Sequence, residues 1–314
     1  MRSKEAKANM RSIALLDGGL GQEIYRRALG VSSPLWSVAV MLEQPEVVTA
    51  VHADFIRAGA KTLTLNTYAA TPTRLRKQGV YDQLEAIHQR AFQALERAID
   101  ATGAQVEIAA CLPPLTASYQ GQPARSFDDL RNEYATLVQL QANADVFLIE
   151  TMTNTLEARA ACAAAGELGK PFGVAFRLER SGRLKSGETL AEAVTAIEGY
   201  GPAAVMLNCF EPELMTDAMP ELVDLYPTVG GYANAFKSVE AMARGGSADA
   251  LEVRSDISPE AYVAHVRQWM ADGASVVGGC CEITPAHIRH LAHVLAGECN
   301  FIRFSQLDPN IGAV

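Results

Sequence analysis

Short apolar segments alternate with longer segments of helical periodicity along the whole chain. Eight of the short segments are almost continuously apolar, which is typical of parallel strands that are covered on both faces. We therefore predict strands at 13–17, 61–66, 106–111, 145–150, 171–176, 203–208, 228–232 and 274–279.

Helical patterns fill the intervals between these strands. Pro45 suits the first turn of a helix, and Val48 and Val51 share one face behind it. The glycine-rich stretch 243–248 is predicted to be a loop. N-cap signals stand at Ser126, Ser258 and Thr284, and glycines suited to helix C-termini stand at Gly59, Gly103, Gly169 and Gly273.

Eight strands that alternate with helices predict an α/β protein with a (β/α)₈ TIM barrel. A length of 314 residues suits one large barrel, so we predict a single domain over residues 1–314. A doubly wound open sheet is the alternative fold. In a barrel, the active site lies at the carboxyl ends of the strands.

Charge and composition exclude some functions. The net charge of −9 argues against binding to a nucleic-acid backbone, which needs clustered Lys and Arg. No apolar stretch approaches the ~18 residues of a membrane-spanning helix. Six cysteines in so long a chain do not resemble a disulfide framework, so we expect a reducing cytoplasm.

Three cysteines follow two of the predicted strands. Cys209 closes one apolar run, and Cys280 and Cys281 follow two glycines at the end of another. The glycines would let the chain bend so that both thiols face one side. Three thiolates with an open fourth position are a catalytic zinc arrangement, and inert buried cysteines are the alternative. The other cysteines, Cys111, Cys162 and Cys299, are interpreted as core or surface residues without a role.

Further polar groups gather at the same strand ends. Asp17 and Glu150 would suit a substrate ammonium group, although acid–base and purely structural roles are also open. Gly18 and Gly19 form a glycine-rich turn that lacks the third glycine of a dinucleotide site. The turn would either present backbone N–H groups to a carboxylate or serve only its own geometry. His287, His290 and His293 are interpreted as a solvated face of the last helix rather than a metal site.

At these residues the chain resembles the homocysteine S-methyltransferase family. The resemblance implies a zinc-dependent barrel that methylates homocysteine to methionine, with zinc on Cys209, Cys280 and Cys281. It also implies that Asp17 and Glu150 hold the substrate, that Gly18 and Gly19 lie against its amino-acid moiety, and that Asn208 belongs to the substrate-binding set. The matching pieces, in family order, are Asp17-Gly18-Gly19, Asn66-Thr67-Tyr68, Pro113-Pro114, Ser118-Tyr119, Glu150-Thr151, Asn208-Cys209, Tyr232-Ala233-Asn234-Ala235 and Gly278-Gly279-Cys280-Cys281.

Departures from the family pattern fall beside the motifs rather than on the zinc thiols. Gln22, Ala69 and Glu282 stand where relatives often have other residues, which leaves the methyl donor open. S-methylmethionine is favoured, with S-adenosylmethionine, a betaine and a methyl-corrinoid as alternatives. The acceptor is expected to be homocysteine, with another thiol or a selenol as the alternative. Aromatic side chains that would either face the donor cation or serve packing are Tyr68, Phe210 and Tyr232.

Competing functions use the same thiols differently. Zinc-dependent hydrolysis would ordinarily employ His and carboxylate ligands, which are not evident beside these cysteines. A zinc or thiol sensor, or a non-catalytic family member, would need the thiols but not the two acids. The presence of Asp17 and Glu150 with all three cysteines favours an enzyme.

Overall fold

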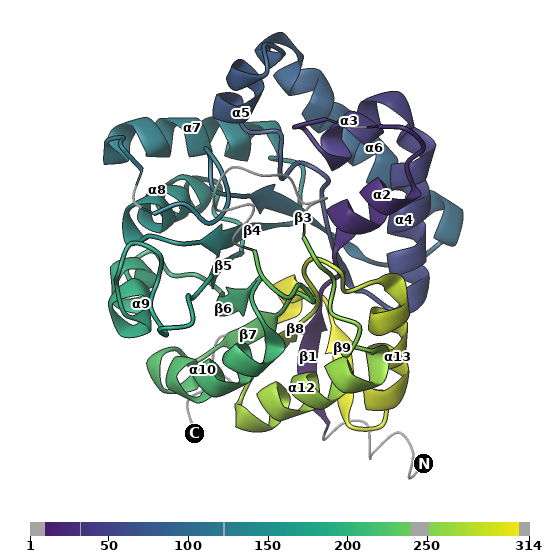
Figure 1. Cartoon of the computed structure of the whole chain (residues 1–314), viewed down its shortest axis with the longest axis vertical. Helices are drawn as coiled ribbons and strands as arrows, with labels where there is room; N and C mark the ends of the chain where they lie inside the picture. The colour runs from purple at the N-terminus through teal and green to yellow at the C-terminus, as the bar shows by residue number, and fades with distance from the viewer. Residues whose placement is uncertain (1–9, 32, 122, 240–250, 308–314) are drawn as a thin grey trace.

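Parallel strands curl into a barrel that is surrounded by helices in the computed structural model (Figure 1). The model describes residues 10–31, 33–121, 123–239 and 251–307, so the loop predicted at 243–248 lies outside the described residues. The strand order is β2-β3-β4-β5-β6-β7-β8-β1-β9. The strands are β1 (Arg11–Leu15), β2 (Thr62–Thr64), β3 (Glu107–Leu112), β4 (Val146–Met152), β5 (Phe172–Phe176), β6 (Ala204–Asn208), β7 (Val229–Tyr232), β8 (Val276–Val277) and β9 (Cys299–Ile302).

Contacts between β1 and β2 close the barrel. Leu16 and Thr62 form a parallel bridge, and the Lys61 and Asp17 N–H groups donate to the Leu15 and Thr62 carbonyls at 2.9 and 3.1 Å. All eight predicted strands are present, and the closure confirms the TIM barrel over the doubly wound open sheet.

One strand was missed by the sequence reasoning. β9 pairs in parallel with most of β1, from Arg11↔Cys299 to Ala14↔Ile302. Most of its side chains are half-buried, so its sequence lacks the continuous apolar run of a strand that is covered on both faces. Phe304 follows it and is fully buried, with its N–H donating to the Thr62 hydroxyl at 2.9 Å. The C-terminal segment therefore packs against the amino-terminal end of the barrel.

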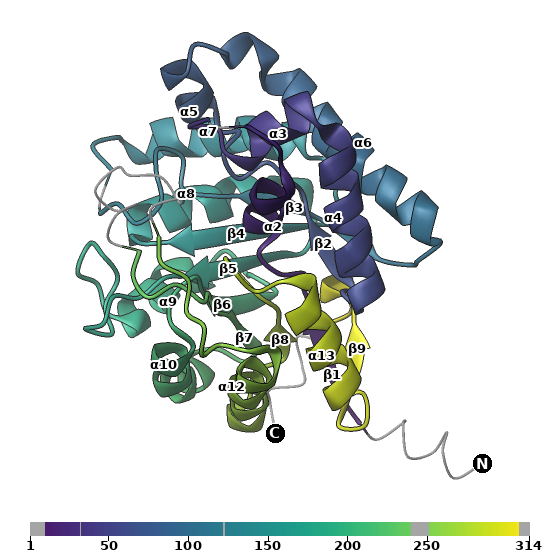
Figure 2. The same cartoon turned by 45° about the vertical axis from the view of Figure 1, so that its right-hand side comes forward.

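Helices cover the outside of the barrel, and Figure 2 shows α4 lying beside α6. The predicted caps are confirmed, since the Ser126 and Ser258 side chains accept N–H groups from Asp129 and Ala261. Among the described residues, no helix has the length and apolarity to cross a membrane. The α-helices are α2 (Leu20–Arg27), α3 (Ser37–Glu43), α4 (Pro45–Ala58), α5 (Pro72–Lys77), α6 (Leu84–Thr102), α7 (Phe127–Leu140), α8 (Thr155–Ala165), α9 (Leu190–Glu198), α10 (Pro212–Leu225), α12 (Pro259–Asp272) and α13 (Pro285–Leu295).

The histidines of α13 differ from the prediction of a solvated face. His287 is only 8% exposed, and its Nδ1 accepts the N–H of Thr284 at 3.2 Å. Its Nε2 donates to the Ile257 carbonyl at 3.0 Å. His287 therefore caps the helix, whereas His290 is half-buried and His293 is exposed. The expectation of solvation was wrong for His287, because its side chain completes the N-cap of α13.

The buried apolar side chains form two clusters, one outside the sheet of the barrel and one inside it. The larger one fills the space between the strands and the helices. The smaller one lies inside the barrel and combines small side chains such as Ala109 and Ala175 with Leu148, Met206 and Phe304. Because this interior is packed, the room for a ligand lies above it, at the carboxyl ends of the strands.

Candidate active site and metal centre

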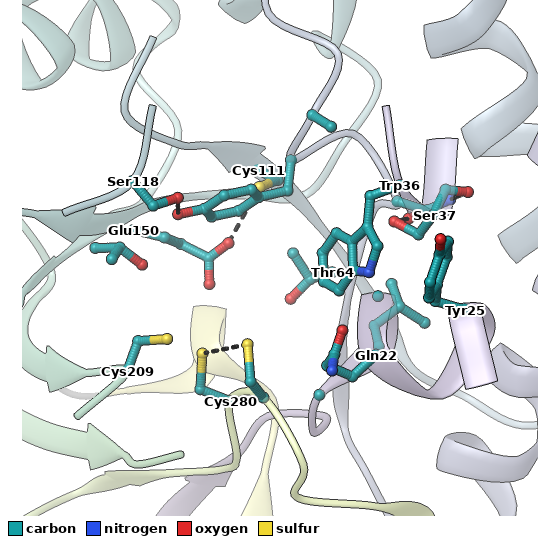
Figure 3. Close-up of a pocket in the computed structure, with 18 of the residues that line it drawn as sticks. Gln22, Tyr25, Trp36, Ser37, Thr64, Cys111, Ser118, Glu150, Cys209 and Cys280 are labelled. Atoms are coloured by element: carbon teal, nitrogen blue, oxygen red, sulfur yellow. Dashed lines mark hydrogen bonds between the residues drawn. The ribbon is translucent and has the colours of Figure 1, made fainter. Parts of the chain in front are cut away.

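The three predicted thiols meet at the carboxyl ends of β6 and β8. The Sγ atoms of Cys209, Cys280 and Cys281 all lie within 4.8 Å of one another, and those of Cys280 and Cys281 are 4.0 Å apart. Figure 3 shows the Cys209 and Cys280 sulfurs facing the same space as Glu150. The prediction that the three thiols converge is confirmed.

The backbone after β8 brings the vicinal thiols to one side. Strand geometry ends at Val277, and the Ile283 N–H closes a turn by donating to the Cys280 carbonyl at 3.0 Å. A Cβ on Gly279 would lie 2.3 Å from Ile283 Cγ2, so this turn leaves no room for a larger residue. The bend predicted from the glycine pair is therefore present.

The glycine turn after β1 packs directly against this thiol loop. A Cβ on Gly18 would lie 2.3 Å from the Ile283 carbonyl oxygen, and one on Gly19 would lie 2.6 Å from the Cys280 carbonyl oxygen. The Gly19 N–H already donates to the Ile283 carbonyl at 2.8 Å and is not free for a ligand.

In the described chain, the N–H groups of Gly18, Gly21 and Gln22 have no hydrogen-bond partner. The start of α2 can therefore receive an anion.

Two carboxyl groups line the same cavity. Asp17 is 4% exposed and accepts both the N–H and the hydroxyl of Thr64, at 2.9 and 3.1 Å. Glu150 accepts the Tyr232 hydroxyl at 3.2 Å and the Cys111 thiol at 3.1 Å. Both acids therefore have neutral donors and, among the described residues, no cationic partner within 4 Å.

Burial sets the ionisation of these acids. It raises the pKa of Asp17 to about 7, with the Glu150 charge adding to the rise and the Thr64 hydrogen bonds opposing it. It likewise raises the pKa of Glu150 to about 7, against the hydrogen bonds from Cys111 and Tyr232. Such a pair is poised to bind a cation, because a bound ammonium group would favour both ionised forms.

Asn208 braces the two strand ends that carry Glu150 and Cys209. Its Oδ1 accepts the Thr151 N–H and its Nδ2 donates to the Thr151 hydroxyl, both at 3.0 Å. Thr151 and Cys209 each have positive φ, of 60° and 61°, which is costly for residues other than glycine. Asn208 lines the cavity, but these two bonds engage its amide in holding the strand ends.

The Cys209 sulfur has further polar neighbours. The Tyr119 hydroxyl lies 3.2 Å from it, and Asn234 Nδ2 lies 3.9 Å from it. Hydrogen bonding from Cys280 and Cys281 holds the pKa of Cys209 well below its ordinary value, while the pKa of each of those two thiols is raised. A divalent cation would bind these sulfurs as thiolates and displace their remaining protons.

The donor set fits a thiophilic metal ion. Tetrahedral coordination with Zn–S bonds of ~2.3 Å places sulfur atoms about 3.8 Å apart, close to the observed Cys280–Cys281 separation of 4.0 Å. Soft thiolate ligands select metals such as zinc. Three protein ligands that face a cavity leave one coordination position for a substrate, as catalytic sites do.

Several cavity residues were missed by the sequence reasoning. Cys111 is buried and donates to Glu150 Oε2, although it was interpreted as a residue without a role. Its place at the carboxyl end of the third strand was the available signal. Trp36 has φ 50°, and its indole Nε1 is buried without a partner. The cavity also includes the half-buried Tyr25, which lies near Trp36 in Figure 3.

The three aromatic candidates differ in position. The Tyr68 hydroxyl is 2.9 Å from Ser118 Oγ, and its ring lines the cavity. Tyr232 also lines the cavity and is held by Glu150. Phe210 is buried outside it, among the residues of a smaller cavity on the other side of Asn234. Tyr68 and Tyr232 are thus placed to meet a ligand, whereas Phe210 serves packing.

Comparison with known proteins agrees with this geometry. A family model described as homocysteine S-methyltransferase matches residues 14–295. The chain belongs to the homocysteine S-methyltransferase family. The match includes the glycine turn, both acids and all three thiols.

Individual relatives are distant but span the whole barrel. A homocysteine S-methyltransferase of Escherichia coli is 28% identical over 306 residues, which cover 91% of this chain and 96% of that protein. A selenocysteine methyltransferase of Astragalus bisulcatus is 27% identical, with coverages of 90% and 92%. The solved structure of the E. coli homocysteine methyltransferase MmuM in its metallated form has a TM-score of 0.75 and 25% identity, covering 90% of this chain and 96% of that one.

Proposed function

We propose that this protein is a zinc-dependent methyltransferase that transfers a methyl group from an onium donor to the sulfur of L-homocysteine, giving L-methionine. The observation that carries the proposal is the convergence of Cys209, Cys280 and Cys281 with two acids, Asp17 and Glu150, in one cavity of about 570 Å³. The family membership supports the same acceptor.

The acceptor would be held at three points. Zinc on the three cysteines would keep the homocysteine sulfur in its thiolate form at neutral pH, where a free thiol is mostly protonated. Asp17 and Glu150 would bind the ammonium group, and the unpartnered N–H groups at the start of α2 would receive the carboxylate. These contacts aim the sulfur at the donor, which is catalysis by positioning.

The transfer itself needs no general base. The homocysteine sulfur attacks the donor methyl carbon in line, one carbon–sulfur bond forms, and the bond to the positive sulfur or nitrogen breaks. The bonding pair stays on the donor, which leaves uncharged at that atom. A site of three thiolates beside two carboxylates also attracts a cationic donor electrostatically.

S-methylmethionine is our favoured donor, with S-adenosylmethionine or a betaine as alternatives. A second acceptor has specific support, because the relative from Astragalus bisulcatus is a selenocysteine methyltransferase. A selenol would occupy the same position as the thiol, so competition between homocysteine and selenocysteine in one assay would rank them.

Metal content and turnover of the same preparation test the proposal. We expect about one zinc per chain in a sulfur shell that gains a further sulfur ligand when homocysteine is added, measured by zinc-edge X-ray absorption. Methionine should form only in the metal-loaded protein. Zinc that is indifferent to homocysteine would instead support a non-catalytic, metal-binding role.

A further inference from the structure

The cavity carries positive charge as well as the two acids. Among the described residues that line it, the cationic side chains are Arg74 and Lys77, both on α5. The cavity of about 570 Å³ falls within the range of roughly 300–1,000 Å³ that holds drug-sized ligands. Homocysteine is much smaller, so the cavity has room for a second ligand.

The half-buried guanidinium of Arg74 has few hydrogen-bond or ion-pair partners. Its Nη2 donates to the Pro114 carbonyl at 2.8 Å, and its charge lies 5.2 Å from the centre of the Tyr68 ring. Its Nε is buried without a hydrogen-bond partner. Within residues 10–31, 33–121, 123–239 and 251–307, no partner is found for Nη1 and no carboxylate lies within 4 Å.

Other arginines of this protein show the contrast. Arg125 is paired with Glu133 at 2.9 Å, and the neighbouring Arg76 reaches the same acid at 3.8 Å. Glu157 feels the charge of Arg74, which lowers the pKa of that acid against burial. Its oxygens, however, accept hydrogen bonds from Leu115, Tyr134 and Asn154. The free edge of the Arg74 guanidinium is therefore available to an anion.

The charge of Arg74 also acts on two other residues that line the cavity. Its charge lowers the pKa of Tyr68 and of Cys111, although burial raises both pKa values overall. The Tyr68 ring contacts Arg74, and both residues line the same cavity as Cys209. A ligand passing along Tyr68 would span from the thiols to the guanidinium.

We propose that Arg74 binds the carboxylate of the methyl donor and is thus a specificity-determining residue of this enzyme. This inference rests on the proposed methyl transfer. In the proposed function the acceptor carboxylate binds at the start of α2, which leaves Arg74 for the donor. The positive end of the donor then faces the thiols and acids, and the negative end of the donor faces α5. Lys77, exposed at the mouth, adds to the attraction of the anion.

Paired donors test the assignment directly. S-methylmethionine and its methyl ester share the sulfonium and ammonium groups, and only the first has a carboxylate. We expect Arg74→Gln to lower kcat/KM for S-methylmethionine by about 10- to 100-fold, the value of a charge-assisted hydrogen bond. The ester should be used equally by both proteins. The homocysteine KM should not change, and Arg74→Lys should recover part of the loss.

Arg76→Gln is the matched control, because Arg76 lies on the same helix but outside the cavity. Equal losses with both donors, or a raised homocysteine KM in Arg74→Gln, would overturn the assignment. Calorimetric binding of S-methylmethionine to zinc-loaded wild type and Arg74→Gln gives a readout without turnover, and equal affinities would also overturn it. Absence of methyl transfer from every donor, with binding still dependent on Arg74, would refute the proposed reaction but retain the carboxylate site.

Discussion

Replacing Asp17 by Asn should make the ligand-free protein more stable while weakening substrate binding. Asp17 is 4% exposed, and burial raises its pKa from 3.8 to about 7. Each pKa unit corresponds to about 1.4 kcal/mol, so the ionised carboxylate costs the folded state up to ~4 kcal/mol. An asparagine retains the shape and can still accept the Thr64 N–H. We therefore expect a gain of about 2–4 kcal/mol above pH 7.

The pH dependence identifies the cause of this gain. The pKa of Asp17 is higher in the folded than in the unfolded state, so the unfolded chain ionises first as the pH rises. Wild type therefore loses stability between pH 3.8 and about 7 and no more above that. Asp17→Asn lacks this loss, so its advantage should be near zero at pH 4 and complete at pH 8. Urea unfolding of both proteins at several pH values measures it.

Glu150→Gln is the matched control. Its pKa rises from 4.5 to about 7, and the side chain is partly exposed to the cavity, so its gain should be smaller than that of Asp17→Asn. Both variants should bind homocysteine more weakly in calorimetry. An advantage of Asp17→Asn that does not vary with pH, or a variant less stable than wild type at pH 8, would refute the reasoning.

Three further predictions concern the same cavity. Cys281→Ser should lose zinc and methyl transfer together, with the far-ultraviolet circular dichroism unchanged; activity without bound metal would contradict the mechanism. The homocysteine KM should rise below pH 7, up to about tenfold per pH unit for each acid that must ionise, because the proposed ammonium binding needs the carboxylate forms of Asp17 and Glu150, and initial rates from pH 6 to 8.5 would show it. Cys111→Ala should raise that KM severalfold at constant zinc content, and Cys111→Ser should restore it; equal KM values would exclude a role for this thiol.

The sequence predicted the strands that repeat around the barrel. All eight strands that it marked are present because burial on both faces leaves a continuous apolar run, whatever the tertiary details. The convergence of Cys209 with Cys280 and Cys281 followed from the rule that the carboxyl ends of barrel strands meet. The three thiols already suggested zinc, and the family resemblance then added homocysteine as the substrate, which the residues alone left open.

Other features depend on contacts between distant segments and left no local pattern. β9 is held by pairing with β1 and by the burial of Phe304, rather than by its own half-buried sequence. His287 is buried because its imidazole completes a cap with Thr284 and reaches the Ile257 carbonyl. Neither hydrogen bond could be predicted from a histidine spacing that equally suits an exposed helix face.

The glycine turn links the loop that carries the thiols to Asp17 at the end of β1. A glycine-rich turn suggests a ligand that approaches the backbone, yet at Gly18 and Gly19 the approaching group is the protein's own thiol loop, through the carbonyls of Ile283 and Cys280. Any side chain here would push that loop away and move the thiols relative to Asp17. The glycines therefore keep the three thiols in register with Asp17, and the loss of a glycine should impair the proposed metal binding and substrate binding together.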